Sequence, residues 1–184
     1  MQLKDYFSNL SQKQSKVFFS GISSDSSKVK KNYIFFAIKG NKIDGNNFIG
    51  EAIKKGAKII VSEKKINKQK DDIIFLYSSN VRKSLAETSY KILNIKPRKL
   101  VAVTGTNGKS SIADFYYQIL DYNFKKVASI GTIGVRYGKK KIELNNTTLD
   151  PIYLSSILKD LKKKKIFTKW SFIYLYKKYK KIVV

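Results

Sequence analysis

Short apolar runs and amphipathic stretches alternate along the first half of the chain. Runs rich in β-branched and aromatic residues, which are typical of buried strands, occupy residues 32–38, 58–62 and 72–77. Two other segments, 46–57 and 81–93, carry apolar side chains at helical spacing. The order strand, helix, strand, strand, helix is that of an α/β unit, and the pattern predicts one here.

The second half of the chain repeats this alternation after a polar segment. Residues 94–99 contain one of the two prolines and predict a boundary between domains 1–97 and 98–169. Asp150 followed by Pro151 is typical of a helix start. The pattern then predicts a strand at 99–104, a helix at 110–122 and a strand at 126–134. A hairpin at 135–144 that turns near Gly138 and a last helix at 151–164 follow. The helix 110–122 has Ile112, Phe115, Tyr116 and Ile119 on one side.

Composition removes several classes of site. The chain has 184 residues, of which 42% are hydrophobic, so it can form a core. It contains neither cysteine nor histidine. Disulfides, thiolate metal sites, histidine metal sites and histidine-based catalytic triads are therefore excluded. The N-terminus lacks the apolar core of a signal peptide, and no run approaches the roughly 18 apolar residues of a spanning helix. We expect a soluble cytoplasmic protein without stable membrane insertion.

The formal net charge of +25 does little to change the expectation of a soluble cytoplasmic protein. Arg82, Arg98 and Arg136 are the only arginines among 38 basic residues, so the other 35 are lysines. Asn, Ile, Tyr and Phe also recur, and their codons, like those of lysine, are rich in A and T, which favours genome composition as the origin of the charge. The lysines are spread along the chain and form no arginine-rich stripe with interleaved aromatic residues. We do not expect nucleic acid as a main partner.

Candidate chemistry lies in residues 101–111, which read VAVTGTNGKSS. Glycines between a buried strand and a helix let backbone N–H groups approach phosphate oxygens. A following lysine reaches the β- and γ-phosphates, and the next hydroxyl is a ligand for Mg²⁺. Gly105, Gly108, Lys109 and Ser110 fill these positions. The standard pattern G-x-x-x-x-G-K-[ST] has glycine where Val103 stands, and composition does not explain that difference.

These residues resemble the nucleotide loop of the Mur ligase family, the ATP-dependent amide-forming enzymes of peptidoglycan synthesis. The family loop reads T-G-T-N-G-K-[ST] after an aliphatic residue, so Val103 fits the resemblance. Residues 24–63 are similar to the N-terminal UDP-binding domain of the family. IGTIG (130–134) and NTTLD (146–150) resemble the MurE-type branch. That branch adds the third stem-peptide amino acid to UDP-N-acetylmuramoyl-L-alanyl-D-glutamate.

The resemblance implies a fold, a reaction and site residues. The fold would be α/β, with an N-terminal substrate domain followed by part of a P-loop NTPase-like parallel sheet with helices. ATP would phosphorylate the D-glutamyl carboxylate, and the amine of diaminopimelate or lysine would attack the acyl phosphate. Lys109 would be the catalytic residue and Ser110 the Mg²⁺ ligand. The residues that would bind ATP are Gly105, Thr106, Asn107, Gly108, Lys109, Ser110 and Ser111.

The resemblance also implies substrate contacts. Ser24, Ser26, Asn41, Lys42 and Ile43 match positions that contact the uridine nucleotide, and Asn146, Thr147 and Thr148 match the loop that holds the muramoyl-peptide. Taken without the family, Ser26 is equally an ordinary turn serine, and residues 146–148 are more simply a polar loop before a capped helix.

Several positions depart from the family pattern. Ser27 replaces an arginine, Lys31 replaces a glycine, and Leu149 replaces the proline of N-T-T-P. Asn41-Lys42-Ile43 stands where a histidine-containing triplet is common.

The end of the chain matches no family motif. Residues 162–184 contain nine lysines and no acidic residue. We expect a truncated or frameshifted product that is inactive alone, with a divergent basic tail at 170–184 that does not pack. The alternatives are a split enzyme whose partner chain supplies the missing domains, a membrane-binding tail, and a non-catalytic module that binds nucleotide or UDP-sugar.

Overall fold

Four parallel strands form the sheet of the first part of the chain. They are β1 (Gly21–Ser23), β2 (Tyr33–Ala37), β3 (Ala57–Ser62) and β4 (Ile74–Tyr77), side by side in the order β1-β2-β3-β4. The structure is a computed structural model that describes residues 1–40, 43–66, 72–94, 100–103, 106–131, 133–144, 149–164 and 170–174. The chain divides into two units, Met1–Ile92 and Leu93–Val184, and each is described by itself.

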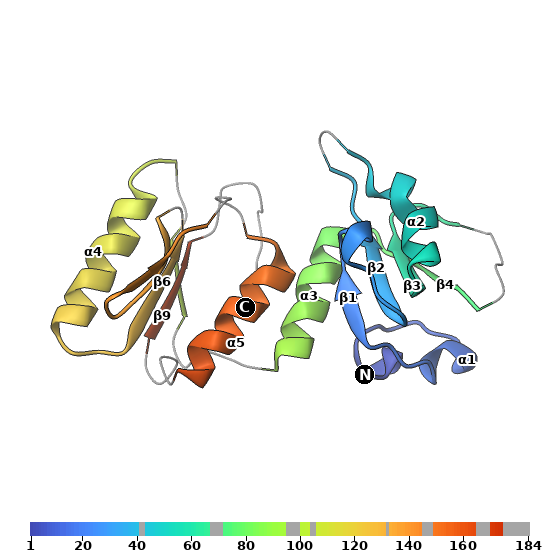
Figure 1. Cartoon of the computed structure of the whole chain (residues 1–184), viewed down its shortest axis with the longest axis horizontal. Coiled ribbons are helices and arrows are strands. Elements are labelled where there is room, and N and C mark those ends of the chain that lie inside the picture. Colours follow the sequence, from blue (N-terminus) through green and yellow to red (C-terminus); the bar gives the residue numbers. More distant parts are fainter. Residues whose placement is uncertain are drawn as a thin grey trace. The chain divides into compact units, whose positions relative to one another are not determined.

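Both faces of the first sheet are covered because its strands are apolar on both sides. Phe35 and Ile60 pack with Ala52 of α2 (Ile49–Lys54), while Ile34 and Phe36 point to the opposite face. Figure 1 shows α2 and α3 (Val81–Leu93) on the two sides of this sheet. The remaining elements are short: η1 (Leu3–Asp5), α1 (Gln12–Ser15), η2 (Ser26–Lys28) and η3 (Gly45–Phe48).

The second unit contains a five-stranded mixed sheet in the order β5-β9-β6-β7-β8. Its strands are β5 (Leu100–Val103), β6 (Val127–Gly131), β7 (Gly134–Tyr137), β8 (Lys140–Ile142) and β9 (Trp170–Tyr174). Strands β5, β9 and β6 are parallel, and β7 and β8 form an antiparallel hairpin on β6.

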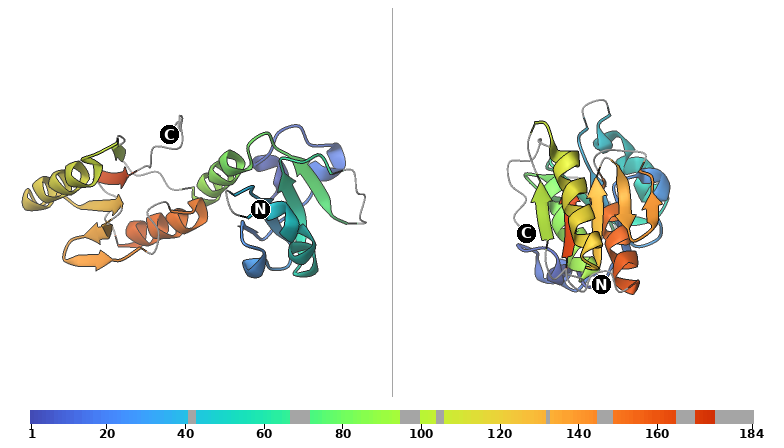
Figure 2. Two further views of the ribbon diagram at one scale, coloured as in Figure 1. Left: turned by 90° about the horizontal axis from the view of Figure 1, so that it is seen from above. Right: turned by 90° about the vertical axis from the view of Figure 1, so that its left-hand side faces the viewer.

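Two helices cover this sheet, α4 (Lys109–Tyr122) and α5 (Pro151–Lys163). Ala128 and Ile130 pack with α5, whereas Val127 packs with Tyr117 of α4. Alternate residues of a strand point to opposite faces, so α4 and α5 lie on opposite sides of the sheet, as Figure 2 shows. Among the described residues, none of the helices combines the length and the apolar character that a bilayer span requires.

The predicted α/β class is confirmed, and most predicted elements are present within one or two residues of their expected bounds. Strand β1 was not predicted. The units divide between Ile92 and Leu93, a few residues before the boundary suggested by the proline-containing segment.

Two features differ from the sequence-based expectations. The aromatic and aliphatic side of α4 identified above, including Phe115 and Ile119, is exposed, and the helix packs through Ala113 and Tyr117. A tail that does not pack was expected from residue 170, but Trp170–Tyr174 form β9 between β5 and β6. The five residues have the β-branched and aromatic composition of a strand, and the lysines that suggested a tail lie on either side of them. Residues 175–184 lie outside the described part.

Candidate functional site

The glycine loop connects β5 to α4, as a phosphate-binding loop should. Strand β5 ends at Val103 and α4 begins at Lys109. Gly108 has φ +74°, a backbone conformation that favours glycine, and no side chain caps the helix there. Thr106, Asn107 and Gly108 are exposed, and Gly105 lies outside the described residues. The first N–H groups of a helix lack intrahelical partners, so this end of α4 can receive an anion.

Lys109 is the most unusual residue of the loop because it is a lysine with only 8% exposure. Its Nζ donates a hydrogen bond of 2.7 Å to the carbonyl oxygen of Thr106. The side chain therefore turns back over its own loop and holds its ammonium group beside the backbone of the loop. A buried cation in that place is suited to neutralising phosphate oxygens.

Ser110 and Ser111 follow in the first turn of α4. Ser111 is exposed, whereas Ser110 is partly buried and lines a small pocket. The described residues contain no group of three acidic, histidine or cysteine side chains that could hold a metal ion. Mg²⁺ with nucleotides is commonly bound through one or two protein ligands plus phosphates and water, so a single hydroxyl at Ser110 fits such an ion.

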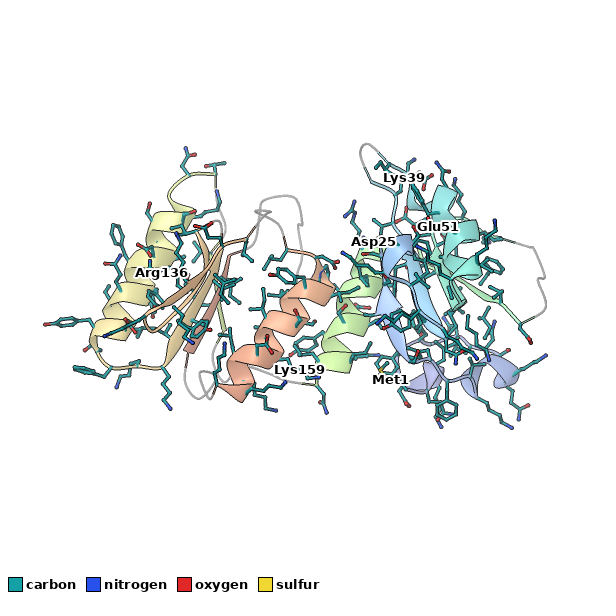
Figure 3. All side chains as sticks on the ribbon, viewed as in Figure 1. Met1, Asp25, Lys39, Glu51, Arg136 and Lys159 are labelled. Atoms are coloured by element: carbon teal, nitrogen blue, oxygen red, sulfur yellow. The ribbon has the colours of Figure 1, made fainter. Side chains whose placement is uncertain are left out.

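The pocket beside Ser110 contains a charged pair that the sequence analysis did not identify. Arg136 of β7 forms an ion pair with Asp114 of α4. The guanidinium also stacks over the ring of Tyr117, with 4.7 Å from its central carbon to the ring centroid. Figure 3 shows Arg136 in the second unit, beside α4. Its rarity among so many lysines was a sequence signal, but its partner lies 22 residues away and could not be read from the sequence.

Of the predicted substrate residues of the first unit, those that the structure describes follow its strands. Ser24 follows β1, Ser26 begins η2, and Ile43 lies between β2 and α2. The carboxyl ends of parallel strands meet at one edge of a sheet, which is where ligands bind in open α/β folds. Figure 3 shows Asp25, Lys39 and Glu51 at this same end of the first unit.

Hydrogen bonds fix the turn after β1. Ser26 is buried and donates from its Oγ to Glu51 Oε2 over 2.7 Å. The hydroxyl of Ser27, at the position of the family arginine, donates to Asp25 Oδ1 over 2.7 Å. The bond from Ser27 lowers the pKa of Asp25, and bonds from Lys55 and then Ser26 lower the pKa of Glu51. The turn is thus held in place by charged carboxylates.

The loop after β2 ends in a third such carboxylate, Asp44. Asp44 accepts from the backbone N–H of Asn46 over 2.9 Å and from the Asn46 side chain over 2.6 Å. These bonds, with a further contribution from Lys64, lower the pKa of Asp44 to about 2. Ile43 is 60% exposed, an apolar side chain offered to solvent. Asn41 and Lys42 lie outside the described residues.

The predicted muramoyl-peptide loop, Asn146, Thr147 and Thr148, also lies outside the described residues. Immediately after it, Asp150 Oδ1 accepts from the backbone N–H of Ile152 over 3.0 Å and caps α5. The expected helix start is therefore present, with Pro151 at its first position.

Comparison with known proteins agrees with this geometry. The model of the Mur ligase family catalytic domain matches residues 19–102, and that of the Mur ligase middle domain matches residues 103–168. The chain belongs to the Mur ligase family. The junction between the two matches lies at the end of β5, so the glycine loop opens the part that matches the Mur ligase middle domain.

Individual Mur ligases support the same assignment. A relative from Rickettsia typhi, named UDP-N-acetylmuramoyl-L-alanyl-D-glutamate–2,6-diaminopimelate ligase, is 38% identical over 158 residues. The match covers 83% of this chain and 32% of that relative, so the chain spans about a third of its length. A solved structure of a ligase with the same name has a TM-score of 0.77 at 23% identity, covering 95% of this chain and 36% of that one.

A second solved structure carries a nucleotide. It is the MurF ligase from Thermotoga maritima in complex with ADP, with a TM-score of 0.53 at 23% identity. The match covers 84% of this chain and 31% of that one, and at this identity both structures establish the fold alone.

Proposed function

We propose that this chain provides the substrate domain and the ATP loop of a ligase that adds the third amino acid to UDP-N-acetylmuramoyl-L-alanyl-D-glutamate. The observation that carries the proposal is the buried Lys109 at the start of α4, held beside an exposed glycine loop. A turn that merely contains glycine and lysine has no reason to bury the ammonium group. The name of the Rickettsia typhi relative favours diaminopimelate over lysine as the amino acid.

The proposed reaction has two steps. The D-glutamyl carboxylate attacks the γ-phosphorus of ATP, ADP leaves, and an acyl phosphate forms. The amine of the amino acid then attacks the acyl carbon, an amide forms, and inorganic phosphate leaves with its bonding electrons. Because both steps move negative charge among phosphate oxygens, the protein contributes mainly positioning and charge neutralisation. We propose that this reaction takes place in the cytoplasm.

Each loop residue has a defined part in this proposal. Residues 105–108 offer backbone N–H groups, and Lys109 exchanges the Thr106 carbonyl for the β- and γ-phosphate oxygens. Ser110 offers its hydroxyl to Mg²⁺, which when bound neutralises part of the phosphate charge.

Substrate binding would use the edge of the first sheet and the loop before α5. Ser26 already donates its hydroxyl proton to Glu51, so it can offer a uridine nucleotide only its oxygen, as an acceptor. Ser24, Asn41, Lys42 and Ile43 would complete this contact. Asn146, Thr147 and Thr148 would hold the muramoyl-peptide.

Calorimetric titration of the purified chain with ADP and Mg²⁺ tests the proposal. We expect saturable binding that Lys109→Ala weakens at least about tenfold, because a charge-assisted contact to phosphate is lost. Lys139→Ala is the matched control, since Lys139 is an exposed lysine of the same unit, in the β7–β8 turn. Absence of binding by the unmodified chain, or equal loss in both variants, would contradict the proposal.

The alternative is a non-catalytic module that binds nucleotide or UDP-sugar and acts with a partner chain. We consider this alternative because the matched relative is about three times longer than the part of it that the chain covers. Product formation from UDP-muramoyl-dipeptide, ATP and diaminopimelate or lysine by this chain alone would exclude the module. We expect binding without turnover, which the module and an inactive part of a ligase share.

A further inference from the structure

Arg136 lies at the wall of the pocket next to the phosphate loop. It belongs to β7, where it pairs with Ser129 of β6, and its side chain reaches α4. The turn between β6 and β7, which precedes Arg136, requires glycine at position 134. This residue has φ +105°, and a Cβ there would lie 2.2 Å from the carbonyl oxygen of Ile142. The turn thus fixes the backbone position from which the Arg136 side chain extends.

The pocket lies between α4 and the β6–β7 hairpin. Ser110, Ala113 and Asp114 come from α4, and the remaining lining residues come from β6, β7 and their turn: Ser129, Gly131, Ile133, Gly134 and Arg136. The space inside it is about 10 Å³, roughly enough for one water molecule. It can therefore admit only a single small group, such as one oxygen, of a ligand that is bound mainly elsewhere.

The guanidinium of Arg136 is oriented but not fully used. Among the described residues, its contacts are the ion pair with one oxygen of Asp114 and the ring of Tyr117. The hydroxyl of Tyr117 donates to the carbonyl oxygen of Gly138 over 2.9 Å, which fixes the ring beneath the guanidinium. A guanidinium has five N–H donors in a planar fork that matches phosphate oxygens. Donors therefore remain for a second anion.

The partner carboxylate is held independently of Arg136. The other oxygen of Asp114 accepts from Gln118 Nε2 over 2.7 Å, within the same helix. Arg136 can therefore turn toward a new anion while Asp114 keeps a hydrogen bond. A phosphoryl group with two negative charges attracts the guanidinium more strongly than one carboxylate does.

We propose that Arg136 binds a γ-phosphoryl oxygen of ATP at this pocket, and that Asp114 holds the guanidinium ready beforehand. This inference rests on the proposed function. Lys109 would reach the β- and γ-phosphates, and Ser110, the next residue, lines the pocket that contains Arg136. A nucleotide that ends at the β-phosphate would lack the group that enters the pocket, so Arg136 would distinguish ATP from ADP.

The test compares the affinities of a non-hydrolysable ATP analogue and of ADP, each with Mg²⁺, by calorimetry. We expect Arg136→Gln to weaken the ATP analogue about tenfold or more and to change ADP affinity less than about twofold. Arg136→Lys should recover part of the loss, since it keeps the charge but not the fork.

The outcomes separate this inference from the proposed function. If the unmodified chain binds neither nucleotide, both are wrong. If it binds both and Arg136→Gln weakens them equally, Arg136 has only a structural role and the inference is overturned. The inference is also overturned if Arg136→Gln changes neither affinity. Retained ADP binding by Arg136→Gln serves as the check that the variant folds.

Discussion

Asp44 caps η3 and shows how single residues hold the edge of the first sheet. Its carboxylate accepts two hydrogen bonds from Asn46 and forms an ion pair with Lys64 at 3.3 Å. These partners are available only in the folded chain, so its pKa falls from an ordinary 3.8 to about 2 on folding. The bonds that Asp44 makes therefore depend on pH in a defined window.

We predict that stability lost between about pH 4 and pH 2 includes a contribution from Asp44. The folded state binds this proton less tightly than the unfolded state does, so protonation favours unfolding as pH falls. Asp44→Asn cannot titrate and should lose less stability across that window. Urea unfolding followed by circular dichroism at several pH values measures the two slopes. Parallel slopes for the variant and the unmodified chain would contradict the prediction.

Two neighbouring aromatic residues of α4 provide a second test at this scale. Tyr117 is 2% exposed and packs against the sheet, whereas Phe115 is 63% exposed. We predict that Tyr117→Ala lowers the free energy of unfolding by about 3 kcal/mol or more. Phe115→Ala should change it by less than about 0.5 kcal/mol. Chemical unfolding of both variants measures the difference, and a larger loss at Phe115 would mean that α4 packs through its other side.

At the residue scale, the sequence predicted local motifs but not contacts between residues that lie far apart in the chain. Lys109 and Ser110 could be proposed from sequence because their chemistry depends on neighbours within a few positions. The same reasoning failed to choose the packed side of α4, since both sides carry apolar residues and burial depends on the sheet. Arg136 and Asp114 meet only because β7 and α4 are brought together by the fold.

At the scale of elements, strand length and sequence context decided what could be predicted. Strands β2 and β3 are long apolar runs and were expected from the pattern. Strand β1 has three residues, Gly21–Ser23, too few to show a period of two. Strand β9 has the right composition, but a lysine-rich context suggested a tail, and only pairing with β5 and β6 identifies it.

The central position of β9 makes a proline there costly. Ile173 pairs with Ala102 of β5 and with Ile130 of β6. We predict that Ile173→Pro destabilises the second unit by about 2 kcal/mol or more, because it removes a ladder hydrogen bond between two strands. Ile173→Val, which keeps the N–H group, is the control. Unfolding followed by fluorescence of Trp170, the single tryptophan, measures the effect, and equal stability would show that β9 does not hold the sheet.

At the scale of the whole molecule, the chain is two units with separate cores. One core lies around Phe35 and Ile60 in the first unit, and the other lies around Ile130 and Leu161 in the second. The proposed uridine-nucleotide contacts belong to the first unit and the proposed phosphate contacts belong to the second. Two ligands with different nucleotide parts would therefore stabilise different halves of the chain.

Hydrogen–deuterium exchange, read peptide by peptide, tests this division. We predict that ADP with Mg²⁺ slows exchange in peptides from the β5–α4 region and leaves the strands of the first unit unchanged. UDP-muramoyl-dipeptide should slow exchange in the peptides that follow β1 and β2. The reason is that a ligand which binds only folded protein stabilises the unit that holds it. Lys109→Ala should abolish the first effect and keep the second. Protection by ADP in the first unit would place the nucleotide elsewhere than the loop that ends at Lys109.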